Sequence, residues 1–254
     1  MAAVPRKIVP LVHPGHLPAA VPVAQLNYHG GAVLGAVQVV PIYWGAFWAD
    51  ADGSQLATQL DAFFDFILTS SFMDLLGEYS TATTTIGPGT RLASVKVSGS
   101  EPGTATPTGR RVTDDQIQQA LQGWIADGTI PAVTANTLYF VYLPPNCVSV
   151  LESDESCQVF CGYHNHVNKT IFYAVEPYIT CLGCTFGTIP DSLTKVSSHE
   201  LAEAITDPAL DAWFEDSGGG DEIGDICNTS TTHLGGYLVQ NQWSNAQLAC
   251  VIAP

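Results

Sequence analysis

A histidine and two glutamates stand at the spacing of a metal-binding helix in the stretch His199-Glu200-Leu201-Ala202-Glu203. Residues 195–207 contain strong helix formers and no glycine, and Pro208 predicts the end of the helix because proline lacks an N–H group. On such a helix His199 and Glu203 lie one turn apart on the same face. The pattern is typical of the first half of a zinc-hydrolase helix of the H-E-x-x-H type, with Glu203 in place of the second histidine.

This chemistry gives each side chain a separate task. His199 and Glu203 would bind the ion, and Glu200 would be the base that takes a proton from metal-bound water. The third ligand is expected to be Glu222 or Asp225, because the three glycines that precede them let the chain turn back. Zn²⁺ is the expected ion, although an additional carboxylate makes Ca²⁺ and Mn²⁺ more competitive.

Simpler interpretations of the same residues stay open. A solvated helix with a histidine near its start shows the same pattern. The acidic segment that follows could be a calcium loop formed with Asp216 and Asp221. Asp207 is a weaker candidate ligand, because a regular helix places it about 12 Å along the axis from His199. Alternatively, Asp207 has only a structural role at the C-terminus of the helix, beside Pro208.

Composition and charge narrow the classes of partner. The chain has 254 residues, a net charge of −16 and a pI of about 4.4, so nucleic acids and anionic membranes are poor partners. It contains no run of about 18 apolar residues, so no transmembrane helix is expected. From Val196 to Pro254 there are nine acidic residues and no Lys or Arg, which indicates either a solvated acidic face or a cation site.

The seven cysteines all lie between Cys147 and Cys250. In a chain poor in Lys and rich in Ser, Thr and Gly, this clustering favours disulfides and an oxidising compartment, and hence a secreted protein. Cys227 and Cys250 flank the last hairpin-like stretch and are expected to be bonded. The alternative for the other close pairs is a structural zinc site. Its four ligands would be Cys157, Cys161, Cys181 and Cys184.

The order of the expected elements predicts an α/β (α+β) fold. Strands are expected over residues 36–44, 92–97, 137–143 and 169–175, and helices over 54–68, 72–79, 113–127 and 195–208. Pro41 is expected at a bulge or a sheet edge. Residues 147–168 are expected to be a loop, which places His164 and His166 at the surface. We therefore expect a single zincin-like domain over residues 26–254, preceded by an extended arm over residues 1–25. Its twisted mixed sheet is backed by helices, and its C-terminal half contains the disulfides.

Several short segments resemble the EXORDIUM-like, or phosphate-induced, secreted proteins of plants. The segments are residues 28–31 with the strand that follows, 160–164, 181–184 and 206–208, in the same order. The resemblance implies a non-catalytic relative associated with the cell wall and growth, because the plant proteins lack the His-Glu pair.

Residues 198–208, 221–225 and 239–246 resemble a group of bacterial and fungal exported proteins regarded as zincin-like metallopeptidases. This resemblance implies a peptidase activity that depends on a metal. The chain departs from well-studied zincins at Glu203, where those proteins have a second histidine, and this puts the identity of the metal in question.

The leading hypothesis is a secreted zinc-dependent metallohydrolase, specifically an endopeptidase, that acts as a monomer on protein or peptide substrates. Its metal ligands would be His199, Glu203 and Glu222 or Asp225, and Glu200 would activate the metal-bound water. The alternative is a non-catalytic, EXORDIUM-like protein of the cell wall with a structural Ca²⁺ ion in the acidic loop. Neither hypothesis includes nucleic acid or a membrane as a partner.

Overall fold

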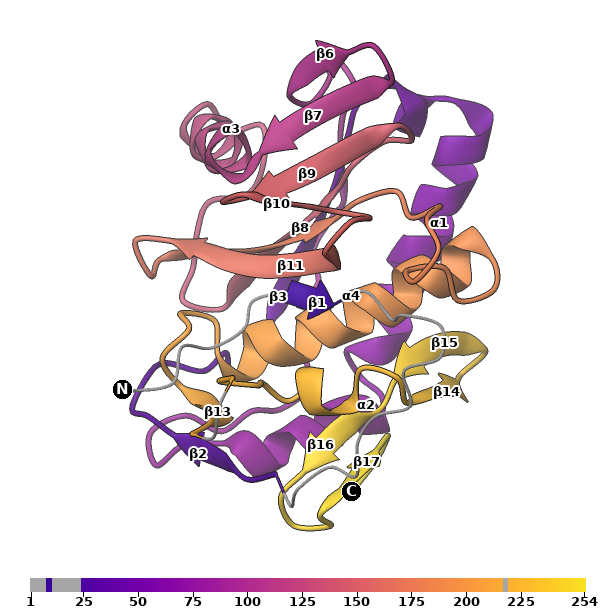
Figure 1. The fold of residues 1–254 in the computed structure, drawn as a ribbon. Helices are drawn as coiled ribbons and strands as arrows, with labels where there is room; N and C mark the ends of the chain where they lie inside the picture. The colour runs from indigo at the N-terminus through magenta and orange to yellow at the C-terminus, as the bar shows by residue number, and fades with distance from the viewer. Residues whose placement is uncertain (1–7, 11–23, 217–218) are drawn as a thin grey trace.

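The computed structural model of the chain describes residues 8–10, 24–216 and 219–254 (Figure 1). Its main sheet has seven strands in the order β1-β11-β12-β8-β3-β4, and β5 also pairs with β3. The strands are β1 (Ile8–Pro10), β3 (Gln38–Trp44), β4 (Thr90–Arg91), β5 (Val95–Val97), β8 (Thr137–Tyr142), β11 (Phe160–Val167) and β12 (Ile171–Glu176). β3, β8 and β12 run parallel, whereas β11 is antiparallel to β12 and β1 is antiparallel to β11. The predicted mixed sheet is thus confirmed.

Four α-helices occur in the described part of the chain. They are α1 (Ala51–Ile67), α2 (Ser71–Leu76), α3 (Asp114–Ala126) and α4 (Ile189–Thr206). Three short 3-10 helices accompany them, namely η1 (Ala46–Ala49), η2 (Gly77–Tyr79) and η3 (Asp225–Cys227). None of these helices combines the length and the apolar character that a membrane span requires.

Helices cover both faces of the main sheet, and the central strands therefore contribute to two cores. In β8, Leu138 and Phe140 belong to the core shared with α1 and α4, whereas Tyr139 and Val141 belong to the core shared with α3. This alternation follows from the two-residue period of a strand. All residues of β8 are buried, which explains its nearly continuous apolar sequence.

Smaller sheets complete a single α+β domain. One has four strands in the order β10-β9-β7-β6, and three have two strands each, β13-β2, β14-β15 and β16-β17. The strands are β2 (Leu26–Tyr28), β6 (Thr104–Thr106), β7 (Gly109–Thr113), β9 (Cys147–Leu151), β10 (Asp154–Glu155), β13 (Trp213–Glu215), β14 (Thr231–Leu234), β15 (Tyr237–Gln240), β16 (Gln242–Ser244) and β17 (Ala249–Val251). The predicted arm over residues 1–25 falls largely outside the described residues, so its boundary stays a prediction.

One expectation about the strands is wrong, and another is met only in part. The predicted loop over residues 147–168 contains β9, β10 and β11. Pro41 does not lie at an edge, because β3 pairs with β8 on one side and with both β4 and β5 on the other. Pro41 lies opposite the short gap between β4 and β5. Its missing N–H group therefore costs no hydrogen bond to a neighbouring strand on that side.

Helix α4 starts six residues earlier than its predicted start at residue 195. The side chain of Thr188 accepts a hydrogen bond from the N–H group of Asp191, and the side chain of Asp191 accepts one from the N–H group of Thr188. This capping box and Pro190 in the first turn are strong start signals that lie before the predicted start of the helix. The helix ends at Thr206, close to the predicted stop at Pro208.

Candidate metal centre

The candidate residues come together around the middle of α4. This helix lies between β11 of the main sheet and the C-terminal strands, and it packs against β15 (Figure 1). Every residue from Ser192 to Thr206 is buried, so the interpretation of α4 as a solvated helix is wrong. Gly162 permits the close approach of β11, because a Cβ atom there would lie 2.7 Å from Cγ1 of Val196.

His199, Glu203 and Asp225 form a group of converging side chains, all of them fully buried. Nε2 of His199 lies 2.8 Å from Oε1 of Glu203 and 3.9 Å from Oδ1 of Asp225. None of these three atoms has a hydrogen-bond partner among the described residues. Buried polar atoms are normally paired because an unpaired one costs free energy. A nitrogen and two carboxylate oxygens that converge in this way could serve as ligands of a divalent cation.

The other ring nitrogen of His199 is held by Gln240, a residue that no sequence pattern singles out. Nδ1 of His199 lies 3.0 Å from Oε1 of Gln240. The amide nitrogen of Gln240 donates to the carbonyl oxygen of Gly224 at 2.7 Å, so its Oε1 is the atom that accepts from His199. The neutral imidazole then keeps the lone pair on Nε2, as metal ligation requires.

The expectation that His164 lies at the surface is wrong. This residue is 0% exposed, and its Nδ1 lies 3.1 Å from Oε2 of Glu200 and 3.5 Å from Oε2 of Glu203. Because residues 160–167 form a strand, alternate side chains share one face, and His164 follows Gly162 on the face that meets α4. His166 lies near the end of that strand and is partly exposed. Recognising this strand in the sequence would have selected His164.

Both proposed third ligands lie at the cluster, next to different histidines. Asp225 in η3 is beside His199, whereas Oε2 of Glu222 lies 3.8 Å from Nε2 of His164. Glu222 is fully buried and neither of its carboxylate oxygens has a hydrogen-bond partner among the described residues. Its N–H group donates to Oδ2 of Asp225 at 3.1 Å, which fixes the two carboxylates relative to each other.

Two other acidic candidates have partners elsewhere. Oδ1 of Asp207 accepts hydrogen bonds from the N–H groups of Asp211 and Ala212, at 2.6 and 2.7 Å, which gives it a structural role after the end of α4. Asp216 accepts from the amide of Asn27 at 2.7 Å. Residues 217 and 218 lie outside the described residues, so the calcium loop stays a prediction.

Electrostatic repulsion is strong in the cluster when no cation is bound. Burial and the charge of Glu203 raise the pKa of Glu222 and of Asp225 well above their usual values. Burial opposes protonation of His164, but its hydrogen bond to Glu200 and the charges of Glu200 and Glu203 raise its pKa to about 10. Burial also opposes ionisation of Glu203, but the two histidines lower its pKa to about 2. A divalent cation would replace the protons that this site otherwise takes up.

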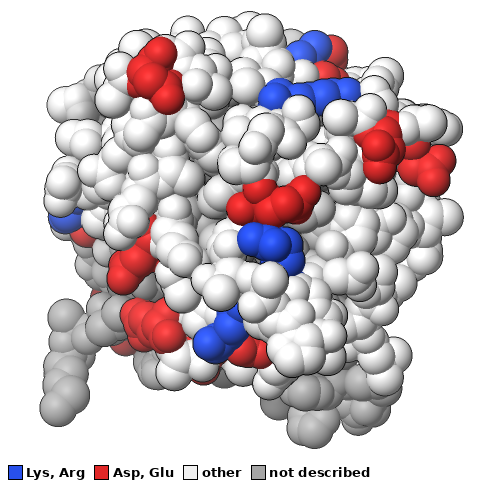
Figure 2. All heavy atoms as spheres, turned by 90° about the horizontal axis from the view of Figure 1, so that it is seen from above, with Lys and Arg blue, Asp and Glu red and all other residues white. Residues whose placement is uncertain are grey.

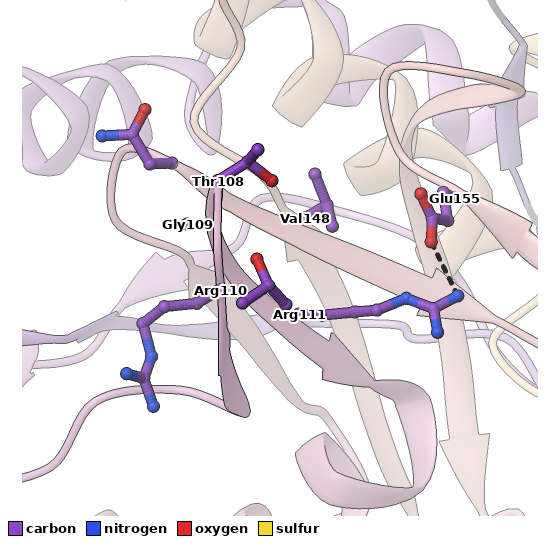
Figure 3. Close-up of a pocket in the computed structure, with 8 residues that line it drawn as sticks. Thr108, Gly109, Arg110, Arg111, Val148 and Glu155 are labelled. Carbon is purple, nitrogen blue, oxygen red and sulfur yellow. Dashed lines mark ion pairs between the residues drawn. The ribbon is translucent and has the colours of Figure 1, made fainter.

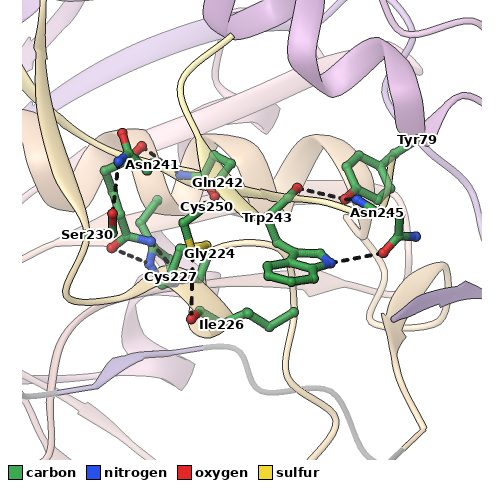
Figure 4. The surroundings of a disulfide bond; sticks show 12 residues. Tyr79, Gly224, Ile226, Cys227, Ser230, Asn241, Gln242, Trp243, Asn245 and Cys250 are labelled. Atoms are coloured by element: carbon green, nitrogen blue, oxygen red, sulfur yellow. Dashed lines mark hydrogen bonds between the residues drawn. A yellow bond between two sulfur atoms is a disulfide. The ribbon is translucent and has the colours of Figure 1, made fainter. Parts of the chain in front are cut away.

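The predicted disulfide between Cys227 and Cys250 is confirmed, and it lies close to the cluster. Cys227 ends η3, the short helix that begins with Asp225. Figure 4 shows the surrounding contacts, among them the hydroxyl group of Tyr79, which donates to the carbonyl oxygen of Trp243 at 2.7 Å. The disulfide and these contacts fix the position of the segment that carries Asp225.

Two further disulfides join Cys157 to Cys181 and Cys161 to Cys184. The four-cysteine zinc site is therefore not formed, and the disulfide prediction is confirmed. These bonds link the start of β11 to the segment before α4. β11 carries His164, and α4 carries His199. Cys147 is the free cysteine of the described chain, and burial raises the pKa of its thiol to about 12. Disulfides persist in oxidising compartments.

A surface cavity away from α4 offers less chemistry. It has a volume of about 250 Å³ and lies on the four-stranded sheet (Figure 3). Arg111 pairs with Glu155 at 2.6 Å, and Arg110 donates to the carbonyl oxygens of Pro102 and Gly103. Both guanidinium groups are thus engaged by the protein itself.

The face drawn in Figure 2 carries few charged residues, and its basic side chains form no extended patch.

Comparison with known proteins shows a distant similarity to a plant protein. The chain is 24% identical over 249 residues to Protein EXORDIUM-like 5 of Arabidopsis thaliana, and the match covers 85% of this chain and 68% of that protein. No family model matches the chain. The similarity supports the resemblance to EXORDIUM-like proteins, and it gives no support to a zincin-like peptidase. The chain is therefore a disulfide-containing α+β protein with distant similarity to an EXORDIUM-like protein.

Proposed function

We propose that the protein is a secreted, metal-dependent hydrolase, and specifically an endopeptidase. The observation that carries the proposal is the convergence of Nε2 of His199 with carboxylate oxygens of Glu203 and Asp225, in a buried place where these atoms have no hydrogen-bond partner in the described chain. The disulfides agree with an extracellular location.

The donor set fits a divalent cation of the Zn²⁺ or Mn²⁺ type. His199 would ligate through Nε2, because Gln240 holds its Nδ1. Glu203 and Asp225 would supply oxygens, and Glu222 is close enough to add another carboxylate. Imidazole together with carboxylates suits these ions better than it suits the softer ones.

Glu200 is the residue that would move a proton. Its Oε2 is held by Nδ1 of His164, and its Oε1 has no hydrogen-bond partner among the described residues and can accept a proton. A bound cation would supply a Lewis acid that polarises a carbonyl group and lowers the pKa of water. His164 orients the carboxylate of Glu200, and burial raises the pKa of that carboxylate, as suits a general base near neutral pH.

A second candidate function is a non-catalytic extracellular protein with a structural cation. Two observations favour it: the distant similarity to an EXORDIUM-like protein, and the complete burial of the side chains of all four candidate ligands, His199, Glu203, Glu222 and Asp225. Structural sites are closed, whereas catalytic sites keep an open position for water.

Cleavage of a generic protein substrate by the full chain distinguishes the two functions. We expect cleavage with Zn²⁺ or Mn²⁺ and none after EDTA treatment. Glu200→Gln keeps the size of the side chain but removes the base, so it should abolish cleavage while the ion at His199 stays bound. Glu152→Gln, an exposed carboxylate in the turn after β9, is the matched control and should cleave like the parent. Cleavage by Glu200→Gln at the parent rate would refute the hydrolase mechanism. Cation-dependent thermal stability without any cleavage would favour the non-catalytic function.

A further inference from the structure

The candidate ligands form two groups that share one residue. His199, Glu203 and Asp225 make the first group, and His164, Glu200 and Glu203 make the second. In each group the ligand atoms lie within 4.8 Å of one another. Glu203 uses a different oxygen in each, since Oε1 is 2.8 Å from Nε2 of His199 and Oε2 is 3.5 Å from Nδ1 of His164. The carboxylate therefore faces two imidazole rings at once.

Two distances within the second group are close to those between neighbouring ligands of one ion. Ligand atoms bound at about 2.1 Å in octahedral or tetrahedral geometry lie roughly 3.0–3.4 Å apart. Nδ1 of His164 lies 3.1 Å from Oε2 of Glu200 and 3.5 Å from Oε2 of Glu203. A carboxylate that bridges two ions holds them about 3.5–4 Å apart, as in two-metal hydrolytic sites.

The charge of the cluster also favours two cations. Glu200, Glu203, Glu222 and Asp225 have fully buried side chains and together carry −4 when ionised. One divalent cation leaves −2 on these four carboxylates, against one buried cationic side chain, Lys195, whereas two divalent cations bring the sum over the four carboxylates to zero with neutral histidines. Uncompensated buried charge is strongly unfavourable. Five carboxylate oxygens of the three glutamates also lack a hydrogen-bond partner among the described residues: Oε1 of Glu200 and both oxygens of Glu203 and Glu222.

We propose that the protein binds a second divalent cation between His164, Glu200 and Glu203, and that Glu203 bridges it to the ion at His199 and Asp225. The second site rests on the ion site of the proposed function. Glu200 binds the second ion through Oε2 and keeps Oε1 for proton transfer, so its two oxygens serve both tasks. The ligand set of imidazole and carboxylates selects Zn²⁺ or Mn²⁺.

Metal stoichiometry tests the second site without any measurement of activity. The full chain is stripped with EDTA and titrated with Zn²⁺ or Mn²⁺, and bound metal is measured by calorimetry and elemental analysis. We expect two ions per chain for the parent, one for His164→Ala and none for Glu203→Ala. His166→Ala, on the same strand but outside the cluster, is the control and should keep two ions. With Mn²⁺ the parent should give the electron paramagnetic resonance signal of a spin-coupled pair, and His164→Ala the six-line signal of an isolated ion.

Glu200→Gln covers the case in which His164→Ala does not fold, because it keeps the volume of the side chain. It should also reduce the stoichiometry from two to one. A parent that binds one ion, with the isolated Mn²⁺ signal at two equivalents of metal, overturns the second site. If that parent still cleaves protein, the proposed function stands. If the parent binds no ion at all, both the second site and the proposed function fail.

Discussion

Gly224 lies directly against the first pair of candidate ligands, where there is no room for a side chain. A Cβ atom added there would lie 2.8 Å from Nδ1 of His199 and 2.9 Å from Oε1 of Glu203. The backbone of Gly224 has φ −83°, which any residue can adopt, so Gly224→Ala adds a purely steric perturbation. The substitution tests the packing of η3 against α4 without removing a ligand.

The expected effect follows from these distances. Ordinary contacts of a Cβ atom begin near 3.4 Å, so the ring of His199 or the carboxylate of Glu203 must move by about 0.5 Å. Metal sites hold ligand distances within about 0.2 Å, and we expect metal affinity to fall about 10–100-fold. Overpacking should lower the free energy of unfolding by about 1–3 kcal/mol, or roughly 2–12 °C in Tm for a chain of this length.

Gly123→Ala is the matched control for this substitution. Gly123 is exposed in α3, and a Cβ atom there would meet nothing within 4 Å. Alanine should raise the free energy of unfolding by about 0.5–1 kcal/mol, because glycine is a poor helix former, and should leave metal affinity unchanged. Calorimetric titration with Zn²⁺ and thermal unfolding with and without EDTA measure both effects. If Gly224→Ala behaves like Gly123→Ala, then η3 does not pack against His199 and Glu203 as described.

Two further predictions concern the disulfide near η3 and the pH dependence of stability. The double variant Cys227→Ser/Cys250→Ser opens a link with a sequence separation of 23, so chemical denaturation should show a loss of about 3 kcal/mol, together with weaker metal binding. Burial and repulsion raise the pKa of Glu222 and Asp225 in the folded, cation-free protein. The stability that these two carboxyl groups contribute is therefore fully present below their pKa values in the unfolded chain, about 4. It is lost as the pH rises through their pKa values in the folded protein. Thermal unfolding in EDTA should therefore show a higher Tm at pH 5 than at pH 7. With saturating Zn²⁺ the Tm should instead be higher at pH 7 than at pH 5, because protons compete with the metal for the carboxylates. A higher Tm at pH 5 in both conditions would contradict a cation site here.

Local patterns were enough to predict where two of the helices begin or end. Pro208 marked the end of α4, and the capping box of Thr113 and Gln116 marked the start of α3. Such signals act over one turn of helix, so they can be read from neighbouring residues. The pairing of Cys227 with Cys250 was also predicted, because both lie next to the last hairpin-like stretch of the sequence.

The sequence alone determined that His199, Glu200 and Glu203 share a helix, because their spacing matches its period. Only the tertiary structure decided that α4 is buried on all sides and that His164, Gln240 and Glu222 face it. These residues come from a strand, a hairpin and a turn that are distant in sequence, and no local period relates them to α4. The approach of β11 depends on Gly162 and that of η3 on Gly224, since a side chain at either position would collide with α4. Contacts between separate elements are set by packing of the whole chain, which is why the second histidine of the cluster was expected at the surface.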